Sequence, residues 1–120
     1  MTITRIDSGP RMSQAVVAGN LVFTAGRVAH ETAGRDVGSQ TREILDGIDA
    51  LLAKAGTDKS RIVSVAIWLA AIGDFDAMNA VYDAWVDKAN PPTRACVEAR
   101  LAGSEYAVEI AVIAEKGSGP

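Results

Sequence analysis

The sequence predicts an α+β fold, a mixed β-sheet with two helices packed on one face, and three observations support this class. Several stretches have the alternation or β-rich composition of strands. Two others have the apolar spacing of amphipathic helices. Their order is β-β-β-α-β-α-β-β, whereas an all-parallel sheet needs a crossover between every pair of strands. The 120 residues have the size of one domain, so we expect residues 1–120 to form a single domain.

The N-terminal part is predicted to form three short strands. Residues 2–6 alternate polar and apolar side chains, and residues 7–10 form a cluster typical of turns. Residues 14–18 and 21–26 are β-rich, and the Gly19-Asn20 pair between them is typical of a tight hairpin turn. The glycines and mixed charges of residues 27–38 predict a loop.

Two segments have helical periodicity. Residues 39–55 carry apolar side chains at i, i+4, i+7 and i+8, which predicts an amphipathic helix. Asp36 or Ser39 could cap its start, and Gly56 stands where a left-handed residue commonly ends a helix. The same spacing predicts a second helix over residues 74–87, which the two prolines at 91 and 92 would keep from continuing.

The strand predicted over residues 60–72 is apolar on both faces, which is typical of a central strand covered on both sides. We expect Val63, Val65 and Ile67 on the face that the helices cover. Ala66 and Trp68 would then need another cover, and we expect a second subunit to supply it. Residues 106–115 predict a last strand, and the tail 117–120 is expected to be frayed.

Composition narrows the function classes. Apolar residues make up 48% and charged residues 22%, which is ordinary for a soluble globular protein. A net charge of −3 without a basic patch argues against nucleic acid or an anionic membrane as a partner. A single cysteine fits a reducing cytoplasm. One histidine and no glycine-rich phosphate loop give no support for a metal or nucleotide cofactor, so we expect none.

The stretch after the Pro-Pro pair carries the first functional indication. Residues 93–101 alternate like a strand, which would put Arg94 and Cys96 on one face. Ala95 and Val97 would lie on the other face, which we predict to be the core side. An arginine and the only thiol, two residues apart beyond a rigid corner, suit the binding of a small anion.

Glu109 is a carboxylate inside an otherwise apolar strand, and a buried carboxylate needs a partner or a function. If the last two strands form a hairpin that turns near Gly103, Glu109 lies opposite Cys96 and one pair from Arg94. The alternatives are a structural Arg94–Glu109 ion pair, a Cys96 that is only a small buried apolar residue, and an Asn79 that is merely solvated. Spacing alone supports a small-anion-binding α+β domain.

Residues 90–101, read with residues 108–114, resemble the signature of the Rid family, also called the RidA/YjgF family of reactive-intermediate imine deaminases. The resemblance extends to Phe-Thr-Ala-Gly at 23–26 and to residues 74–82, and it covers nearly the whole chain. The opening residues and the Ile-Trp-Leu-Ala pattern at 67–70 more closely resemble the YoaB-like branch.

The resemblance implies a chorismate-mutase-like fold and a homotrimer with ligand sites between subunits. It also implies hydrolysis of 2-imino and 2-enamino acids, such as 2-iminobutanoate and 2-iminopropanoate, to 2-oxo acids and ammonia without a metal or cofactor. By position, Arg94 would hold the substrate carboxylate and Glu109 would orient or deprotonate the attacking water. Backbone groups of Gly26 and Cys96 would bind the ligand, and Asn79 matches a family site position.

Met12 departs from the family pattern. Members of the deaminase branch carry a tyrosine in a Gly-Pro-Tyr segment, and Met12 occupies its place in Gly-Pro-Arg-Met here. The change removes a phenol from the expected site. It leaves two other functions open: non-catalytic binding of a 2-oxo acid or similar anion, and a chaperone-like interaction role.

Overall fold

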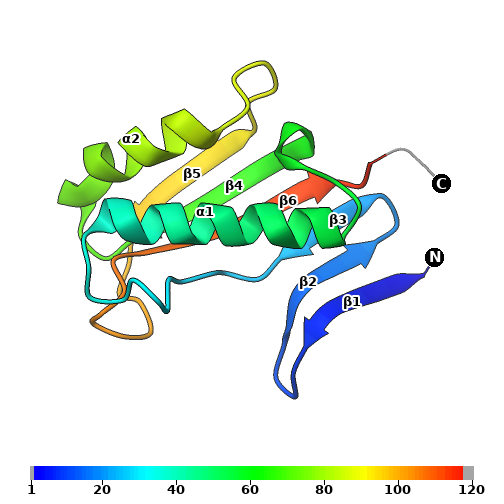
Figure 1. The fold of residues 1–120 in the computed structure, drawn as a ribbon, viewed down its shortest axis with the longest axis horizontal. Helices are drawn as coiled ribbons and strands as arrows, with labels where there is room; N and C mark the ends of the chain where they lie inside the picture. The colour runs from blue at the N-terminus through cyan, green and yellow to red at the C-terminus, as the bar shows by residue number, and fades with distance from the viewer. Residues whose placement is uncertain (1, 118–120) are drawn as a thin grey trace.

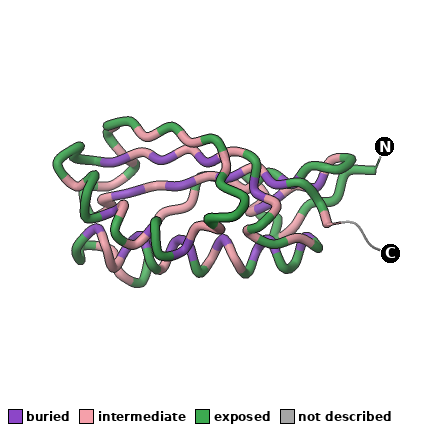
Figure 2. The backbone as a smooth tube through the Cα atoms, turned by 90° about the horizontal axis from the view of Figure 1, so that it is seen from above, coloured by how far each residue is buried: buried purple, intermediate pink, exposed green. Residues whose placement is uncertain are grey.

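The structure, a computed structural model that describes residues 2–117, has two helices on one face of a six-stranded mixed sheet (Figures 1 and 2). It confirms the predicted fold class and element order. The tail beyond Gly117, for which we expect fraying, lies outside the described residues. Short 3₁₀ turns precede β4 and α2 at Lys59–Arg61 and Ile72–Asp74. The elements are β1 (Ile3–Ser8), β2 (Ser13–Ala18), β3 (Leu21–Thr24), α1 (Val37–Lys54), β4 (Ile62–Leu69), α2 (Phe75–Trp85), β5 (Thr93–Glu98) and β6 (Val108–Glu115).

The strand order is β1-β2-β3-β6-β4-β5, and only β4 and β5 run parallel. The predicted hairpin between the last two strands is therefore wrong. A parallel pair needs a crossover, which α2 provides between β4 and β5. The chain then crosses back past β4, and β6 pairs with both β3 and β4. Glu109 consequently pairs with Trp68 and not with Cys96.

The core lies between the helices and one sheet face. Asp36 caps α1 by accepting a hydrogen bond from the Ser39 amide at 3.1 Å, and Gly56 follows the helix at φ +83°, as predicted. The stripe of α1 that meets the sheet and the facing positions of the strands are fully buried. Residues that fill this core include Ile44, Leu45, Ile48, Leu52, Val65, Ile67, Leu69, Val108, Ile110 and Val112.

The predicted faces of β5 are reversed. Arg94 and Cys96 pair with Val65 and Ile67, two residues of the helix-covered core, so they lie on the covered face. Val97 lies on the other face and is 50% exposed. The reversal occurs because the aromatic and amide side chains of α2 accept the arginine (see below). Val63, expected on the covered face, is exposed because the register shifts between residues 62 and 64.

The second face of the sheet carries no helix (Figure 2). It is nonetheless apolar, as the sequence of β4 predicts. Ala66 and Trp68 lie on this face and are half-buried. Leu21, Phe23 and Val97 are exposed large apolar side chains on the same face. We call this the bare face. Within residues 2–117, no helix is both long and apolar enough to span a membrane.

Candidate functional site

Arg94 is held on the surface of α2. Its Nη1 atom donates a hydrogen bond to Asn79 Oδ1 at 2.5 Å. Its Cζ atom lies 4.8 Å from the ring centroid of Tyr82 and 5.6 Å from that of Phe75. Asn79 is therefore not merely solvated, because it fixes one edge of the guanidinium. We call Phe75, Asn79, Tyr82 and Arg94 the arginine cluster.

Cys96 lies beside this cluster on the same face of β5 and packs against the core. Burial raises the pKa of its thiol, and the positive charge of Arg94 opposes the shift only in part. The raised pKa keeps the thiol protonated at neutral pH, where it is a weak nucleophile. The side chain of Cys96 therefore fits the reading of a small, partly buried apolar residue, as the second alternative had it.

Glu109 lies on the bare face. Its neighbours Val108 and Ile110 are fully buried against the helices, so the alternation of β6 directs Glu109 the other way. Gly26 makes room for it, since a Cβ atom on residue 26 would lie 2.1 Å from Glu109 Oε2. The carboxylate thus rests against the backbone of residue 26, in space that a Cβ atom there would otherwise occupy. We call Gly26 and Glu109 the glutamate pair.

Met12 lies near the glutamate pair, because it lines a pocket of about 390 Å³ together with Gly26 and Gln14. Its side chain is 44% exposed. His30 contributes to the same pocket and hydrogen-bonds through Nδ1 to the hydroxyl of Tyr106 at 3.2 Å. His30 itself is exposed.

The arginine cluster and the glutamate pair do not meet within one chain. Arg94 is on the covered face of the edge strand β5, and Glu109 is on the bare face of β6, with β4 between the two strands. The ion pairs within residues 2–117 join Lys54 to Asp7 and Arg61 to Glu115, so the alternative of an intrachain Arg94–Glu109 ion pair is wrong. One chain supplies two separate halves of the predicted site.

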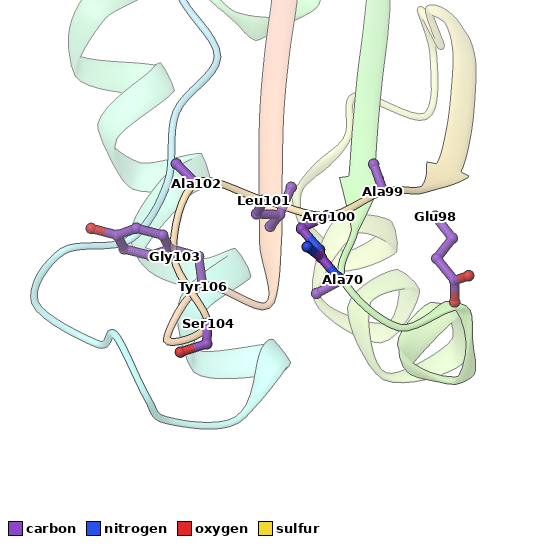
Figure 3. Close-up of a pocket in the computed structure, with 9 residues that line it drawn as sticks. All are labelled: Ala70, Glu98, Ala99, Arg100, Leu101, Ala102, Gly103, Ser104 and Tyr106. Carbon is purple, nitrogen blue, oxygen red and sulfur yellow. The ribbon is translucent and has the colours of Figure 1, made fainter.

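A pocket of about 800 Å³ opens beyond the end of β5, and no residue of the arginine cluster lines it. The connection between β5 and β6 forms most of its wall, with Arg100 between Glu98 and Tyr106 (Figure 3). Glu98 also accepts a hydrogen bond from the amide of Ile72 at 2.9 Å, which ties the start of α2 to the end of β5. None of the residues with predicted site roles lines this pocket.

Phe75 and Tyr82 are the site residues that the sequence analysis missed, because both fit the apolar stripe of an amphipathic helix. The available signal was their spacing. Phe75, Asn79 and Tyr82 follow i, i+4 and i+7, so one helix face presents two aromatic rings around an amide. Such a face suits a guanidinium.

Comparisons with known proteins agree with this architecture. The sequence model of the family described as endoribonuclease L-PSP matches residues 2–116. A RutC family protein of Haemophilus influenzae is 44% identical over 114 residues, which are 95% of this chain and 98% of that protein. The RutC family protein YoaB of Escherichia coli is 41% identical over the same shares of the two chains.

Solved structures of similar proteins have the same fold over nearly the whole chain. A YjgF family protein of Neisseria meningitidis superposes with a TM-score of 0.95 at 41% identity, over 99% of this chain and 98% of that one. A protein of Salmonella typhimurium described as a putative translation initiation inhibitor superposes with a TM-score of 0.86 at 39% identity, over 95% and 97%. Sequence and fold together therefore show that this chain belongs to the Rid/YjgF family, whose family model is described as endoribonuclease L-PSP.

Proposed function

We propose that this protein hydrolyses small 2-imino and 2-enamino acids, of the 2-iminobutanoate and 2-iminopropanoate type, to 2-oxo acids and ammonia. The observation that carries the proposal is that the chain presents both an arginine, Arg94, whose Nη1 is fixed by Asn79, and a carboxylate, Glu109, held against Gly26. A guanidinium grips the carboxylate that every such substrate carries. A carboxylate is the group that can take a proton from water.

The two halves would meet between the subunits of a homotrimer. The bare face exposes Leu21, Phe23 and Val97, whose burial against another copy would remove apolar surface from water. Glu109 lies on that same face, whereas Arg94 lies at the sheet edge formed by β5. A neighbouring copy that covers the bare face could bring its own edge strand, and with it Arg94, towards Glu109.

In the proposed reaction, Arg94 holds the substrate carboxylate and thereby positions the imine carbon. The protonated imine is already electrophilic, so positioning and one base are enough to promote attack. Glu109 accepts a proton from water as the water oxygen bonds to the imine carbon, which gives a carbinolamine. Glu109 then passes this proton to the nitrogen, and the carbon–nitrogen bond breaks as the carbon–oxygen double bond forms, which releases ammonia and the hydroxyl proton. Water is the only co-reactant, and the products are a 2-oxo acid and ammonia.

A second candidate is the non-catalytic binding of a 2-oxo acid or a similar anion. The observation that favours it is Met12, because a thioether stands where the deaminase branch has a phenol, and it lines the pocket beside Gly26. A chaperone-like role through the apolar bare face is a third. In each case we propose a cytoplasmic protein without a nucleic-acid partner, on the grounds of one cysteine and a net charge of −3.

The test is a coupled assay in which an amino-acid oxidase produces 2-imino acids and semicarbazide traps those that survive. Wild-type protein should suppress the trapped product, and Arg94→Ala should not. Arg42→Ala is the matched control, since Arg42 is exposed on α1 and belongs to neither half of the site. Arg94→Lys should also fail, because an ammonium cannot reproduce the two-pronged contact of a guanidinium.

The outcomes separate the candidates. Turnover by wild type that Arg94→Ala abolishes and Arg42→Ala retains supports the deaminase. Absence of turnover, with 2-oxobutanoate binding that Arg94→Ala removes, supports the anion-binding protein. Indifference of both turnover and binding to Arg94→Ala would leave the interaction role.

A further inference from the structure

We infer that α2 acts as a positioning element for Arg94, through Phe75, Asn79 and Tyr82, and that it leaves the Nε/Nη2 edge of the guanidinium for a ligand carboxylate. The inference rests on the proposed function, which it deepens by naming the residues that set the geometry of the carboxylate site and the edge that binds. It concerns binding, so turnover is not needed to test it.

Two aromatic rings of α2 hold Arg94 against the helix. Arg94 stands on an edge strand, where a long cationic side chain would ordinarily extend into water. Here it lies over Tyr82, which is 5% exposed, and over Phe75, and both rings come from one helix face. The electron-rich ring faces attract the guanidinium and restrict it to the surface of α2.

Asn79 sets the direction in which the guanidinium of Arg94 faces. Its Oδ1 atom accepts a hydrogen bond from Nη1 of Arg94. Rotation of the guanidinium about the Nε–Cζ bond would break this hydrogen bond. Within residues 2–117, Nε and Nη2 of Arg94 have no hydrogen-bond partner. Neither of these two atoms is fully buried. These two atoms form one edge of the fork, and both remain accessible. That edge matches the two oxygens of a carboxylate.

Helix α2 is itself anchored to the sheet and the core. A positioning element must be fixed relative to the strand that carries Arg94. The amide of Ile72, just before α2, donates to Glu98 at the end of β5. Met78 and Trp85 are buried on the same helix and fix it to the core. The arginine is therefore held between an anchored helix and an anchored strand.

The experiment combines NMR of the unliganded protein with titration of 2-oxobutanoate. In ¹⁵N-labelled wild type, the Arg94 Nε–H signal, assigned by its loss in Arg94→Lys, should be shifted by the rings, and guanidinium rotation should be slow. Asn79→Ala should speed the rotation, and Phe75→Leu should move the signal. Both variants should weaken 2-oxobutanoate binding by about 3- to 30-fold, as expected for the loss of one contact to a charged group.

Two controls separate positioning from general destabilisation. Tyr82→Phe keeps the ring and should retain the signal position and the binding, whereas Tyr82→Leu should lose both. Ala84→Ser alters the exposed side of α2 and should change neither. Thermal unfolding of every variant identifies any that does not fold, and Phe75→Leu, at a residue 36% exposed, is the one least expected to fail in this way.

The proposed function and this inference fail through different readouts. Binding of 2-oxobutanoate without imine turnover would sink the deaminase and leave the positioning role intact. Turnover with unchanged binding and an unchanged Arg94 signal in Asn79→Ala and Phe75→Leu would overturn the positioning role alone. A faster-rotating guanidinium with unchanged affinity would also overturn it, because the ligand would then not depend on the restraint.

Discussion

The two faces of the sheet carry the two halves of the candidate site under different constraints. On the covered face, Arg94 is restrained by an amide and two aromatic rings of the same chain. On the bare face, Glu109 rests against the backbone of Gly26, and within residues 2–117 no hydrogen bond reaches its side chain. Folding of a single chain therefore arranges the ligand-holding half in advance. The half that would act on water depends on what covers the bare face.

The largest expected effect tests whether the two halves come from different subunits. Arg94→Ala and Glu109→Gln should each be inactive alone, with losses on the order of 10²-fold or more for removal of the base. When the two variants are unfolded together at equal amounts and refolded, activity should return. Random assembly of a symmetric ring gives about a quarter of the sites both intact halves.

Imine hydrolysis after co-refolding measures the recovery, with each variant refolded alone as its control. Recovery near a quarter of wild-type activity would support sites between subunits. Co-refolded variants as inactive as the separate ones, in the presence of mixed oligomers, would contradict the split of the site across two copies.

The second prediction compares an apolar residue from each face. Ile110 is fully buried on the covered face, so Ile110→Ala should lower the free energy of unfolding by about 2–5 kcal/mol. Val97 is 50% exposed in the single chain, so Val97→Asp should leave the chain folded but disrupt its association. Urea unfolding and light scattering after size exclusion measure the two effects. An unchanged molecular mass for Val97→Asp would argue against a covered bare face.

The fold was predictable where local sequence decides it. The periodicity of residues 39–55, the Asp36 cap and Gly56 define α1 within a few residues, because capping and amphipathicity act between neighbours in the chain. Strand pairing depends on distant partners instead. The hairpin expected between β5 and β6 was wrong because β4, which precedes both, takes the place between them.

The sequence named candidate site residues but not their arrangement. The structure places Asn79 against Arg94 and Gly26 against Glu109, in two separate halves, and the roles assigned to these residues stay predictions. The face of Arg94 was predicted wrongly because alternation alone assigns the apolar Ala95 and Val97 to the core. Only the tertiary position of α2 shows that two rings and an amide accept the arginine there.

The third prediction alters the glutamate pair without touching Glu109. Gly26→Ala would place a Cβ atom against the Glu109 carboxylate, which lies at the end of a flexible side chain and can move away. We expect the protein to fold and turnover to fall by roughly tenfold, since misplacement of a base by a fraction of an ångström is costly. Gly73→Ala is the control, because no atom within 4 Å opposes a Cβ there. Equal activity of the two variants would show that the position of Glu109 does not matter.

The smallest expected effect comes from the loss of Asp36, the N-cap of α1, which should lower the stability of the protein without changing its function. Hydrogen bonds from the Ser39 hydroxyl and amide lower the pKa of Asp36 below its ordinary value, so the folded state favours the ionised cap. Because the folded pKa lies below the unfolded one, this stabilisation is complete at neutral pH and is lost as the pH falls through the folded pKa. Asp36→Ala should therefore lower the Tm by a few degrees at pH 7 and by less below about pH 4.

Thermal unfolding of wild type and Asp36→Ala across this pH range measures the difference, and the coupled assay at pH 7 measures function. A Tm difference that stays constant down to pH 3 would mean that the ionised carboxylate contributes nothing to the cap. Turnover should stay at the wild-type level, because Asp36 contacts neither Arg94 nor Glu109. A loss of turnover at a temperature where the variant is folded would instead couple the start of α1 to the site, and the restraint on Arg94 could then not be assigned to α2 alone.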